Sequence, residues 1–261
     1  MSVKTEDRAN QILHVLLRHG RASIEDLIRE LETSAPNIRR DLARLERRGL
    51  VCRTHGGAEL FGPQIYVPFR FDAEFQTREE RFVREKRRIA LAAAELIQEH
   101  ETIGFTAGTT TTQIARSIRH RSNLRIITNA VNIGMELCNQ PGVKTSLTGG
   151  VVQWAGSFSL IGPAAIQSLS EINIDRAFIG VCGMDAKRGA STIESDEAVV
   201  FRAMARQAKQ VVVVADSSKM GMVSPALICP ATEVHTVITD LGVSPDIVAE
   251  LKDKGVEVMA V

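Results

Sequence analysis

The chain has 261 residues, of which 44 % are apolar and 24 % are charged, the composition of a soluble globular protein with one large domain or two modest ones. Its 32 Lys and Arg residues nearly balance its 31 Asp and Glu residues, which excludes a globally basic nucleic-acid-binding protein but leaves a local basic patch open. Aromatic residues make up only 4 %, which argues against a single-strand binder built on stacking platforms.

The first 60 residues predict three short helices followed by a hairpin. Gly20 ends the first helix, and Ser23 with Asp26 resembles the capping box that begins the second. Pro36 fits the first turn of the third helix, where a missing N–H costs little. Apolar residues at helical spacing support this prediction, and they are Ala9, Ile12, Leu13, Leu16, Ile24, Leu27, Ile28, Leu31, Ile38, Leu42 and Leu45.

The third predicted helix lies in the most basic segment of the chain, where Ser34 to Gly56 has a net charge of +4. A helix that buries an apolar face and carries arginines elsewhere is typical of recognition in the DNA major groove. Its first residues then lie near base edges and its later arginines near phosphates. The alternative is an ordinary helix with a solvated arginine face. The candidate DNA-binding residues, two of them on the hairpin, are Ser34, Ala35, Asn37, Arg39, Arg40, Arg44, Arg47, Arg48, Arg53 and His55.

The rest of the chain predicts a second, larger domain. Residues 61–75 contain two prolines and no clear period, which indicates an ordered linker, and Gln76 to His100 then predicts one helix. Short apolar runs alternate with helical patterns after that, which is typical of a mainly parallel sheet flanked by helices. The predicted organisation is α/β, with domains over residues 1–60 and 76–261.

A threonine-rich turn follows the first predicted strand of the larger domain. Thr106, Gly108 and the run from Thr109 to Thr112 stand where a strand ends and a helix begins. Backbone N–H groups at a helix N-terminus, next to glycine and several hydroxyls, can hold an anion such as a phosphate. The turn has neither the G-K-[ST] of a P-loop nor a G-x-G-x-x-G pattern, so a plain threonine-capped turn is the alternative.

Other small, polar or charged turns are predicted to follow strands on the same sheet edge: Thr128-Asn129, Gly149-Gly150, Gly180 to Asp185 and Asp216 to Lys219. In open α/β sheets, ligands bind outside the carboxyl ends of the strands, so these turns predict one polar pocket. Lys219 is expected to pair with a phosphate or carboxylate, and Asp185 to accept hydrogen bonds from sugar hydroxyls. The candidate ligand-binding residues are Thr106, Gly108, Thr109, Thr110, Thr111, Thr112, Asn129, Gly149, Gly150, Asp185 and Lys219.

Catalytic and metal chemistry have no recognisable motif in this sequence. There is no G-x-S-x-G, no H-E-x-x-H and no C-x-x-C, so we expect no catalytic residues, no metal and no cofactor. The four cysteines lie far apart, which predicts reduced, mostly buried thiols rather than disulfides. The first ten residues show no apolar leader and no apolar run reaches membrane-spanning length, so we expect a cytoplasmic protein without a membrane partner.

The segment TSAPNIRRDLARLERRGLVCRTHGGAEL resembles the N-terminal signature of the DeoR family of bacterial transcription regulators. The resemblance extends over nearly the whole chain through EKRRIALAAAELI, GFTAGTTTTQIA, IITNAVNI, LTGG, SLIGPAA, DRAFIGVCGMD, VVVADSSK and VITD. It implies a winged helix-turn-helix domain and a C-terminal effector domain similar to ribose-5-phosphate isomerase. The implied effector is a phosphorylated sugar or similar metabolite, and the implied role is repression of a carbohydrate-catabolism operon.

Three residues depart from the pattern of the family it resembles. Thr106 stands where an aspartate is frequent and Phe201 where a lysine is common, both on the side of the expected pocket. Asn37 replaces the usual threonine of the recognition helix, which bears on operator choice.

Two further functions stay open from the sequence. The first is a sugar-phosphate isomerase-like enzyme, for which Asp185, Glu194, Glu197 or Lys219 would supply the acid or base. An N-terminal winged helix has no use in such an enzyme. The second is an activator of the same architecture. Because operators mirror protein symmetry, the regulator is expected to bind double-stranded operator DNA as a homodimer or homotetramer.

Overall fold

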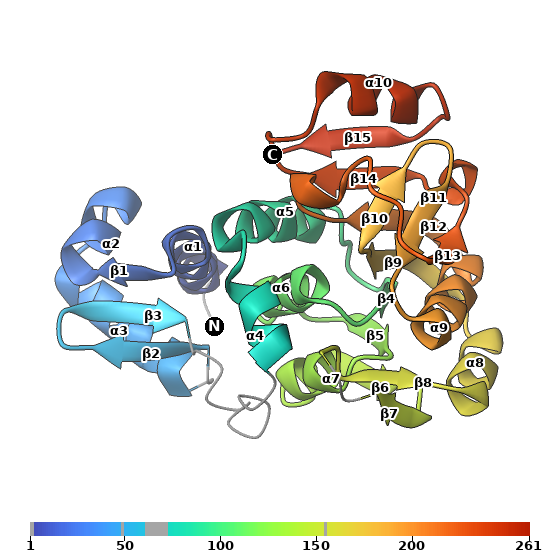
Figure 1. Cartoon of the computed structure of the whole chain (residues 1–261). Coiled ribbons are helices and arrows are strands. Elements are labelled where there is room, and N and C mark those ends of the chain that lie inside the picture. Colours follow the sequence, from blue (N-terminus) through green and yellow to red (C-terminus); the bar gives the residue numbers. More distant parts are fainter. Residues whose placement is uncertain (1–2, 48–49, 61–72, 154–155) are drawn as a thin grey trace. The chain divides into compact units, whose positions relative to one another are not determined.

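The computed structural model describes residues 3–47, 50–60, 73–153 and 156–261, and it divides the chain into two compact units, Met1–Phe71 and Asp72–Val261. Figure 1 shows the units and their elements. Of the linker predicted over residues 61–75, positions 61–72 lie outside the described residues.

The small unit combines three helices with a three-stranded antiparallel sheet in the order β1-β3-β2. Ser23 caps the second helix and Asp26 returns the hydrogen bond, so the predicted capping box is confirmed. The predicted hairpin is β2–β3, and β1 adds a third strand that the sequence analysis did not predict. The elements are α1 (Val3–His19), β1 (Arg21–Ser23), α2 (Ile24–Leu31), α3 (Ala35–Arg47), β2 (Val51–Thr54) and β3 (Gly57–Leu60).

The apolar stripes of the three helices meet in one core, to which Ile12, Leu27 and Ile38 contribute fully buried side chains. Asp41 on α3 is also buried, with 1 % of its side chain exposed, and its carboxylate accepts from Arg8 Nε of α1 at 2.5 Å. This pairing compensates the buried charge and fixes α3 against α1.

The larger unit is built on a seven-stranded parallel sheet in the order β15-β14-β12-β9-β4-β5-β6. The predicted mainly parallel α/β architecture is therefore confirmed. The strands are β4 (Thr102–Phe105), β5 (Leu124–Thr128), β6 (Val143–Leu147), β9 (Ile174–Gly180), β12 (Ala208–Val214), β14 (Thr236–Thr239) and β15 (Glu257–Ala260).

Helices cover both faces of this sheet, with α5 and α6 on one side and α8 and α9 on the other in Figure 1. Phe105 and Phe178 of the adjacent strands β4 and β9 stack at 5.5 Å between ring centroids within the core. The helices are α4 (Ala73–Glu80), α5 (Val83–Glu95), α6 (Thr109–Ser117), α7 (Val131–Leu137), α8 (Pro163–Ser170), α9 (Ser195–Arg206) and α10 (Pro245–Lys252), with the short 3-10 turns η2 (Ser217–Lys219) and η3 (Ala231–Glu233).

Two small antiparallel sheets complete the larger unit, and neither was predicted. One pairs β7 with β8, and the other has the order β10-β11-β13. The segment around Gly183 to Asp185 was predicted as a turn; this is wrong, because those residues form strand β10. The additional strands are β7 (Val151–Gln153), β8 (Ser159–Ile161), β10 (Gly183–Asp185), β11 (Gly189–Thr192) and β13 (Ala226–Cys229).

The single helix predicted from Gln76 to His100 is also wrong, because the structure contains two helices, α4 and α5. Phe82 separates them with a left-handed backbone, φ 57°. Arg81 lies over the ring of Phe82, with its guanidinium carbon 5.0 Å from the ring centroid. Both residues line a cavity, so tertiary packing here overrides the helical preference of the local sequence.

The cysteines and the apolar length of the helices were also addressed by the sequence predictions. The four cysteines are free, but only Cys229 is buried and Cys138 is exposed, so the prediction of mostly buried thiols is wrong. No helix in the described part of the chain is long and apolar enough to cross a bilayer.

Candidate functional site

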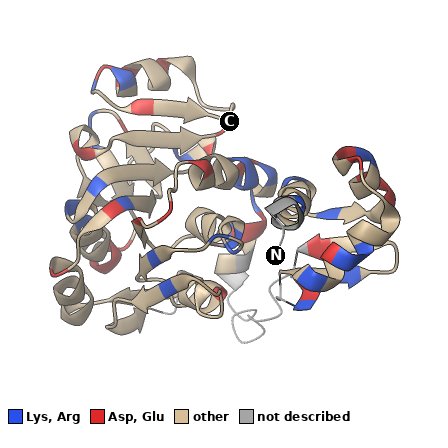
Figure 2. Cartoon of the chain, turned by 180° about the vertical axis from the view of Figure 1, so that it is seen from behind, with Lys and Arg blue, Asp and Glu red and all other residues tan. Residues whose placement is uncertain are grey.

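Most of the candidate DNA-binding residues lie on helix α3 of the small unit, and Ser34 lies in the turn before it. Ile38, Leu42 and Leu45 face the core, whereas Arg39, Arg40 and Arg47 are exposed, as is Ser34. The unit's Lys and Arg residues are blue in Figure 2. Ala35, Asn37 and Arg44 are half-buried, and Asn37 donates to Thr33 Oγ1 at 3.3 Å.

The charges of this surface are largely available to a polyanion. Among the described residues, no acidic side chain forms an ion pair with Arg39, Arg40 or Arg44. Arg53 on β2 lies 3.9 Å from Glu46 in an exposed pair, and His55 is exposed at the β2–β3 turn. Arg48 lies outside the described residues.

The second site is a cavity of about 100 Å³ at the carboxyl edge of the large sheet. The chain runs from β4 to β5 and β6 in one direction and later to β9 and β12 in the other, so the strand order reverses between β4 and β9. Such a switch point is where open α/β sheets bind ligands. The ends of β9 and β12, the start of α6 and the segments that follow β4, β9 and β12 contribute the lining residues Ala107, Gly108, Thr109, Thr110, Gly180, Val181, Cys182, Val214, Ala215, Asp216, Ser218 and Lys219.

Buried polar side chains hold these loops in place. Thr106 Oγ1 accepts from the backbone N–H of Gly180 at 2.9 Å, which ties the loop after β4 to the end of β9. Asn129 Oδ1 accepts from the N–H of Ala107 at 3.0 Å, and its amide nitrogen donates to Ser159 Oγ at 2.8 Å. Thr106 and Asn129 therefore position the loop, and neither lines the cavity.

The N-terminus of α6 opens onto the cavity. Gly108 caps the helix, no side chain supplies the cap hydrogen bond, and Thr109 and Thr110 line the cavity. The hydroxyls of Thr111 and Thr112 donate back to the Gly108 carbonyl at 2.9 and 2.7 Å. The first N–H groups of α6 and the positive end of its dipole thus face the cavity, an arrangement suited to an anion.

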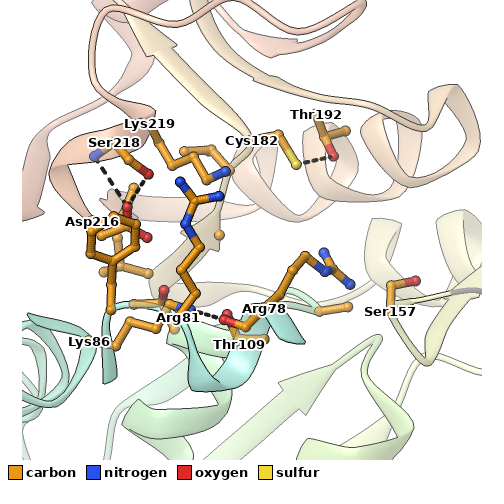
Figure 3. A pocket seen from close by; sticks show the side chains of 18 of the residues that line it. Arg78, Arg81, Lys86, Thr109, Ser157, Cys182, Thr192, Asp216, Ser218 and Lys219 are labelled. Carbon is orange, nitrogen blue, oxygen red and sulfur yellow. Dashed lines mark hydrogen bonds between the residues drawn. The ribbon is translucent and has the colours of Figure 1, made fainter. Parts of the chain in front are cut away.

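Four cationic side chains surround this helix end: Arg78, Arg81, Lys86 and Lys219. Figure 3 shows Arg81 reaching toward Lys219 and Arg78 toward Ser157. The lining residues include only two carboxylates, Asp216 and Glu197. The cavity is therefore electropositive.

Lys86 is the most buried of these cations, with 4 % of its surface exposed, and its Nζ donates to the Arg78 carbonyl. Burial lowers the pKa of Lys86 from its ordinary 10.5 to about 8. Asp216 and Glu79 favour its charged form, whereas Lys219 and Arg78 oppose it. A bound anion would stabilise the charged ammonium.

Turn η2 positions Lys219. Asp216 accepts from the N–H of Ser218 at 3.2 Å, and Asp240 accepts from the N–H of Ser217 at 2.6 Å. Two buried carboxylates thereby fix the backbone that carries the lysine.

The remaining candidate residues lie elsewhere. Gly149 and Gly150 precede β7, and Asp185 Oδ1 accepts from the backbone N–H groups of Lys187 and Arg188 in the β10–β11 turn. None of the three lines the cavity. Of the candidate ligand-binding residues, the structure brings together Gly108, Thr109, Thr110 and Lys219 there.

The sequence analysis did not single out Arg78, Arg81 or Lys86 as cavity residues. They stand in a charged stretch whose residue types match those of any solvated helix face. The left-handed Phe82 turns this stretch toward the sheet edge. Phe201 also lines the cavity and is buried, so an aromatic ring occupies the position where the family it resembles commonly has lysine.

Comparison with known proteins agrees with this two-unit arrangement. Residues 8–64 match the DeoR-like helix-turn-helix domain, and residues 81–241 match the DeoR C terminal sensor domain. A protein of Escherichia coli O157:H7, named as a candidate transcriptional repressor of the aga operon, is 34 % identical over 98 % of this chain and 94 % of its own length.

Another relative is the glycerol-3-phosphate regulon repressor of Escherichia coli strain K12, 30 % identical over 91 % of this chain and 92 % of its own length. A ribose 5-phosphate isomerase structure from Plasmodium falciparum aligns with 54 % of this chain and 52 % of that chain, with a TM-score of 0.38 and 15 % identity. Both matched domains and the names of both relatives describe transcriptional regulators, not enzymes. The chain therefore belongs to the DeoR family of transcription regulators, with a DeoR-like helix-turn-helix domain for DNA and a C-terminal sensor domain for a small-molecule effector.

Proposed function

We propose that this protein represses a carbohydrate-catabolism operon and that a phosphorylated sugar or related metabolite releases it from operator DNA. The observation that carries the proposal is that four cations meet the N-terminus of α6, which no side chain caps, in one cavity. A phosphate is the group that this combination favours, because it accepts from backbone N–H groups and from ammonium and guanidinium donors at once.

In this proposal the phosphate lies on the N–H groups at Thr109 and Thr110, and Lys219 supplies a charge-assisted hydrogen bond. Gly108 places no side chain between the phosphate and the backbone. A Cβ there would lie 3.2 Å from Thr111 Oγ1. Thr106, Thr111, Thr112 and Asn129 act by holding the loop.

A thermal-shift screen tests this proposal most cheaply. Sugar monophosphates, the same sugars without phosphate, and inorganic phosphate are compared on the full chain. A ligand at about 100 times its dissociation constant stabilises the native state by about 2.7 kcal/mol, which raises the melting temperature. We expect stabilisation by at least one phosphorylated sugar and none by its unphosphorylated form. Equal responses to both forms would refute the phosphate site.

Whether the protein represses or activates its operon is tested separately, with a reporter gene placed behind the operator. Repression requires that deletion of the regulator raises expression and that the effector does the same in its presence. Lower expression after deletion would identify an activator and overturn the proposed sign.

The proposal includes a homodimer or homotetramer located in the cytoplasm. A single winged domain has a small footprint of roughly 600–1,000 Å², so a symmetric pair on a palindromic operator supplies the affinity that repression needs. The larger unit is the proposed source of the subunit contacts.

A further inference from the structure

Three buried polar atoms at the cavity have no hydrogen-bond partner among the described residues: Arg78 Nε, Ser157 Oγ and Glu197 Oε1. Glu197 is 7 % exposed and Ser157 is 8 % exposed. Buried polar atoms in folded proteins are nearly always paired, and leaving one unpaired destabilises the fold. Three such atoms at one cavity indicate partners that a ligand supplies.

The three residues come from separate parts of the larger unit. Arg78 lies near the end of α4, Ser157 precedes β8, and Glu197 lies in the first turn of α9. In Figure 3, Arg78 and Ser157 lie at one end of the pocket, and Asp216, Ser218 and Lys219 at the other. Arg78 and Ser157 are therefore set apart from Lys219 and η2, and both interact with Glu197.

Their chemistry differs from that of the phosphate end. Arg78 Nε donates, Glu197 Oε1 accepts, and the Ser157 hydroxyl does either. Burial raises the pKa of Glu197. The neighbouring Ser157 hydroxyl opposes this most, followed by Arg78 and Ser159, whereas Glu194 adds to it. These neighbours lie close to Glu197, but none completes a hydrogen bond of full geometry to its Oε1. A carboxylate opposes a second anionic group, whereas a ligand hydroxyl can donate to Glu197 while accepting from Arg78 or Ser157.

We propose that Arg78, Ser157 and Glu197 form a hydroxyl-recognition subsite, so that the pocket selects a polyol monophosphate over a bisphosphate. Glu197 is the specificity-determining residue. This inference rests on the proposed function, and it assigns to Glu197 the role that the sequence analysis assigns to Asp185.

Calorimetric titration of the full chain tests the subsite with four kinds of probe: inorganic phosphate, glycerol 3-phosphate, hexose 6-phosphates and fructose 1,6-bisphosphate. The variants are Glu197→Gln and Ser157→Ala. Glu194→Gln is the matched control, because Glu194 is an exposed residue at the start of the same helix whose side chain makes no cap hydrogen bond.

The wild type is expected to bind its best monophosphate at least about tenfold more tightly than inorganic phosphate and than the bisphosphate. Glu197→Gln and Ser157→Ala should each lower the affinity for that monophosphate by about tenfold or more. Binding of inorganic phosphate should change by less than about twofold, and Glu194→Gln should match the wild type.

A second readout separates ligand recognition from a structural role. Because Glu197 leaves a buried carboxylate oxygen unpaired in the unliganded protein, Glu197→Gln should leave its melting temperature unchanged or raised. A structural carboxylate would lower it.

Unchanged monophosphate affinity in both variants would overturn the subsite, as would an equal loss for monophosphate and inorganic phosphate. A wild type that prefers the bisphosphate would overturn it too. The proposed function fails in a different way, when no phosphate ester binds the wild type at all. The two failures are therefore distinguishable.

Discussion

At the scale of single residues, Lys86 is a cavity cation whose charge depends on its surroundings. This lysine is nearly buried, and its pKa of about 8 lies within the pH range of ordinary binding experiments. The charged groups around it act on its pKa in opposite directions: Asp216 and Glu79 favour the ammonium, and Lys219 and Arg78 disfavour it. A phosphate in the cavity would shift this balance toward the charged form.

We expect effector affinity to fall as the pH rises through about 8. An anionic ligand raises the pKa of Lys86, so binding takes up a proton once the free lysine is neutral, and affinity falls by up to about tenfold per pH unit. Below pH 8 the lysine is already charged and this contribution is complete. Titration calorimetry at pH 7 and 9 measures the difference, and buffers of different ionisation enthalpy report the proton.

Lys86→Met is the matched variant for this experiment. It should bind the phosphorylated effector more weakly at pH 7 and show no loss between pH 7 and 9. A pH dependence that survives in the variant would show that another group titrates.

The sequence could predict some site residues and not others for a physical reason. Gly108, Thr109 and Lys219 follow strands directly, and the parallel sheet then brings them to one edge. Arg78 and Lys86 reach that edge only through the break at Phe82, a consequence of long-range packing with no local signal. Glu197 has the same difficulty, because a buried glutamate on a helix looks like an exposed one in the sequence.

At the scale of elements, α3 combines a buried apolar stripe with arginines that the small unit leaves without acidic partners among its described residues. With roughly four to eight phosphate contacts per dimer, the log–log dependence of operator affinity on salt should have a slope of about −4 to −7. Electrophoretic mobility or fluorescence anisotropy across a salt series measures it. A slope near zero would contradict a recognition role for α3.

Two arginines of α3 provide a matched pair for the same assay. Arg40→Ala should cost about 1–3 kcal/mol and relax specificity at one operator position, because Arg40 lies near the helix start. Arg47→Ala, in the last turn, should weaken binding to all sequences about equally.

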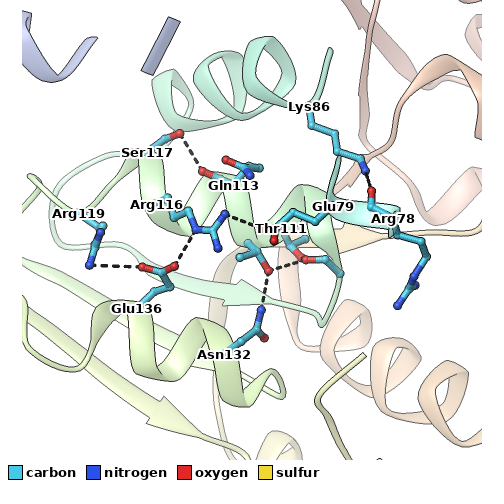
Figure 4. Close-up of polar contacts among 12 residues, drawn as sticks. Arg78, Glu79, Lys86, Thr111, Gln113, Arg116, Ser117, Arg119, Asn132 and Glu136 are labelled. Carbon is cyan, nitrogen blue, oxygen red and sulfur yellow. Dashed lines mark hydrogen bonds and ion pairs between the residues drawn. The ribbon is translucent and has the colours of Figure 1, made fainter. Parts of the chain in front are cut away.

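Helices α4, α6 and α7 are joined by an ion-pair network that Figure 4 shows in detail. Arg116 of α6 bonds Glu79 of α4 at 2.5 Å and Glu136 of α7 at 2.7 Å, and Arg119 lies 3.4 Å from Glu136. Glu136 is only 3 % exposed. The network therefore fixes α4, which carries Arg78, against the helix whose N-terminus faces the cavity.

Glu136→Gln should destabilise the protein by about 3–5 kcal/mol, because it leaves the buried Arg119 without its counter-charge and removes one of the two partners of Arg116. Urea unfolding followed by circular dichroism measures the change. Glu85→Gln is the control: its pair with Arg88 is 3.9 Å long and half-exposed, so its loss should cost about 1 kcal/mol or less. Equal effects of the two substitutions would contradict a stabilising network.

The sequence predicted those elements correctly that show periodicity or a long apolar run. An example is the run Val211 to Val214 of β12, which is buried on both faces of the sheet. The strands of the small sheets have three or four residues each, such as Gly183–Asp185, and are too short to show a period. Pairing with β11 makes that segment a strand, and this partner is distant information that a local pattern does not contain.

At the scale of the whole molecule, the account requires more than one copy on the operator. Light scattering at micromolar concentration should give a mass of two or four times the 28.5 kDa of one chain. A single species at 28.5 kDa would contradict the proposed symmetric recognition. Repeating the measurement with effector shows whether release from DNA accompanies a change of assembly.

The account's central claim is that a phosphate-recognising cavity controls DNA binding, and effector-driven operator release in the Lys219→Ala variant tests it most directly. The variant should bind the operator as the wild type does but need roughly ten- to a hundredfold more effector for release, because a charge-assisted hydrogen bond contributes about 1.5–3 kcal/mol. Lys187→Ala, an exposed lysine outside the cavity, should behave as the wild type. Loss of operator binding in Lys219→Ala, or release at the wild-type effector concentration, would contradict the claim.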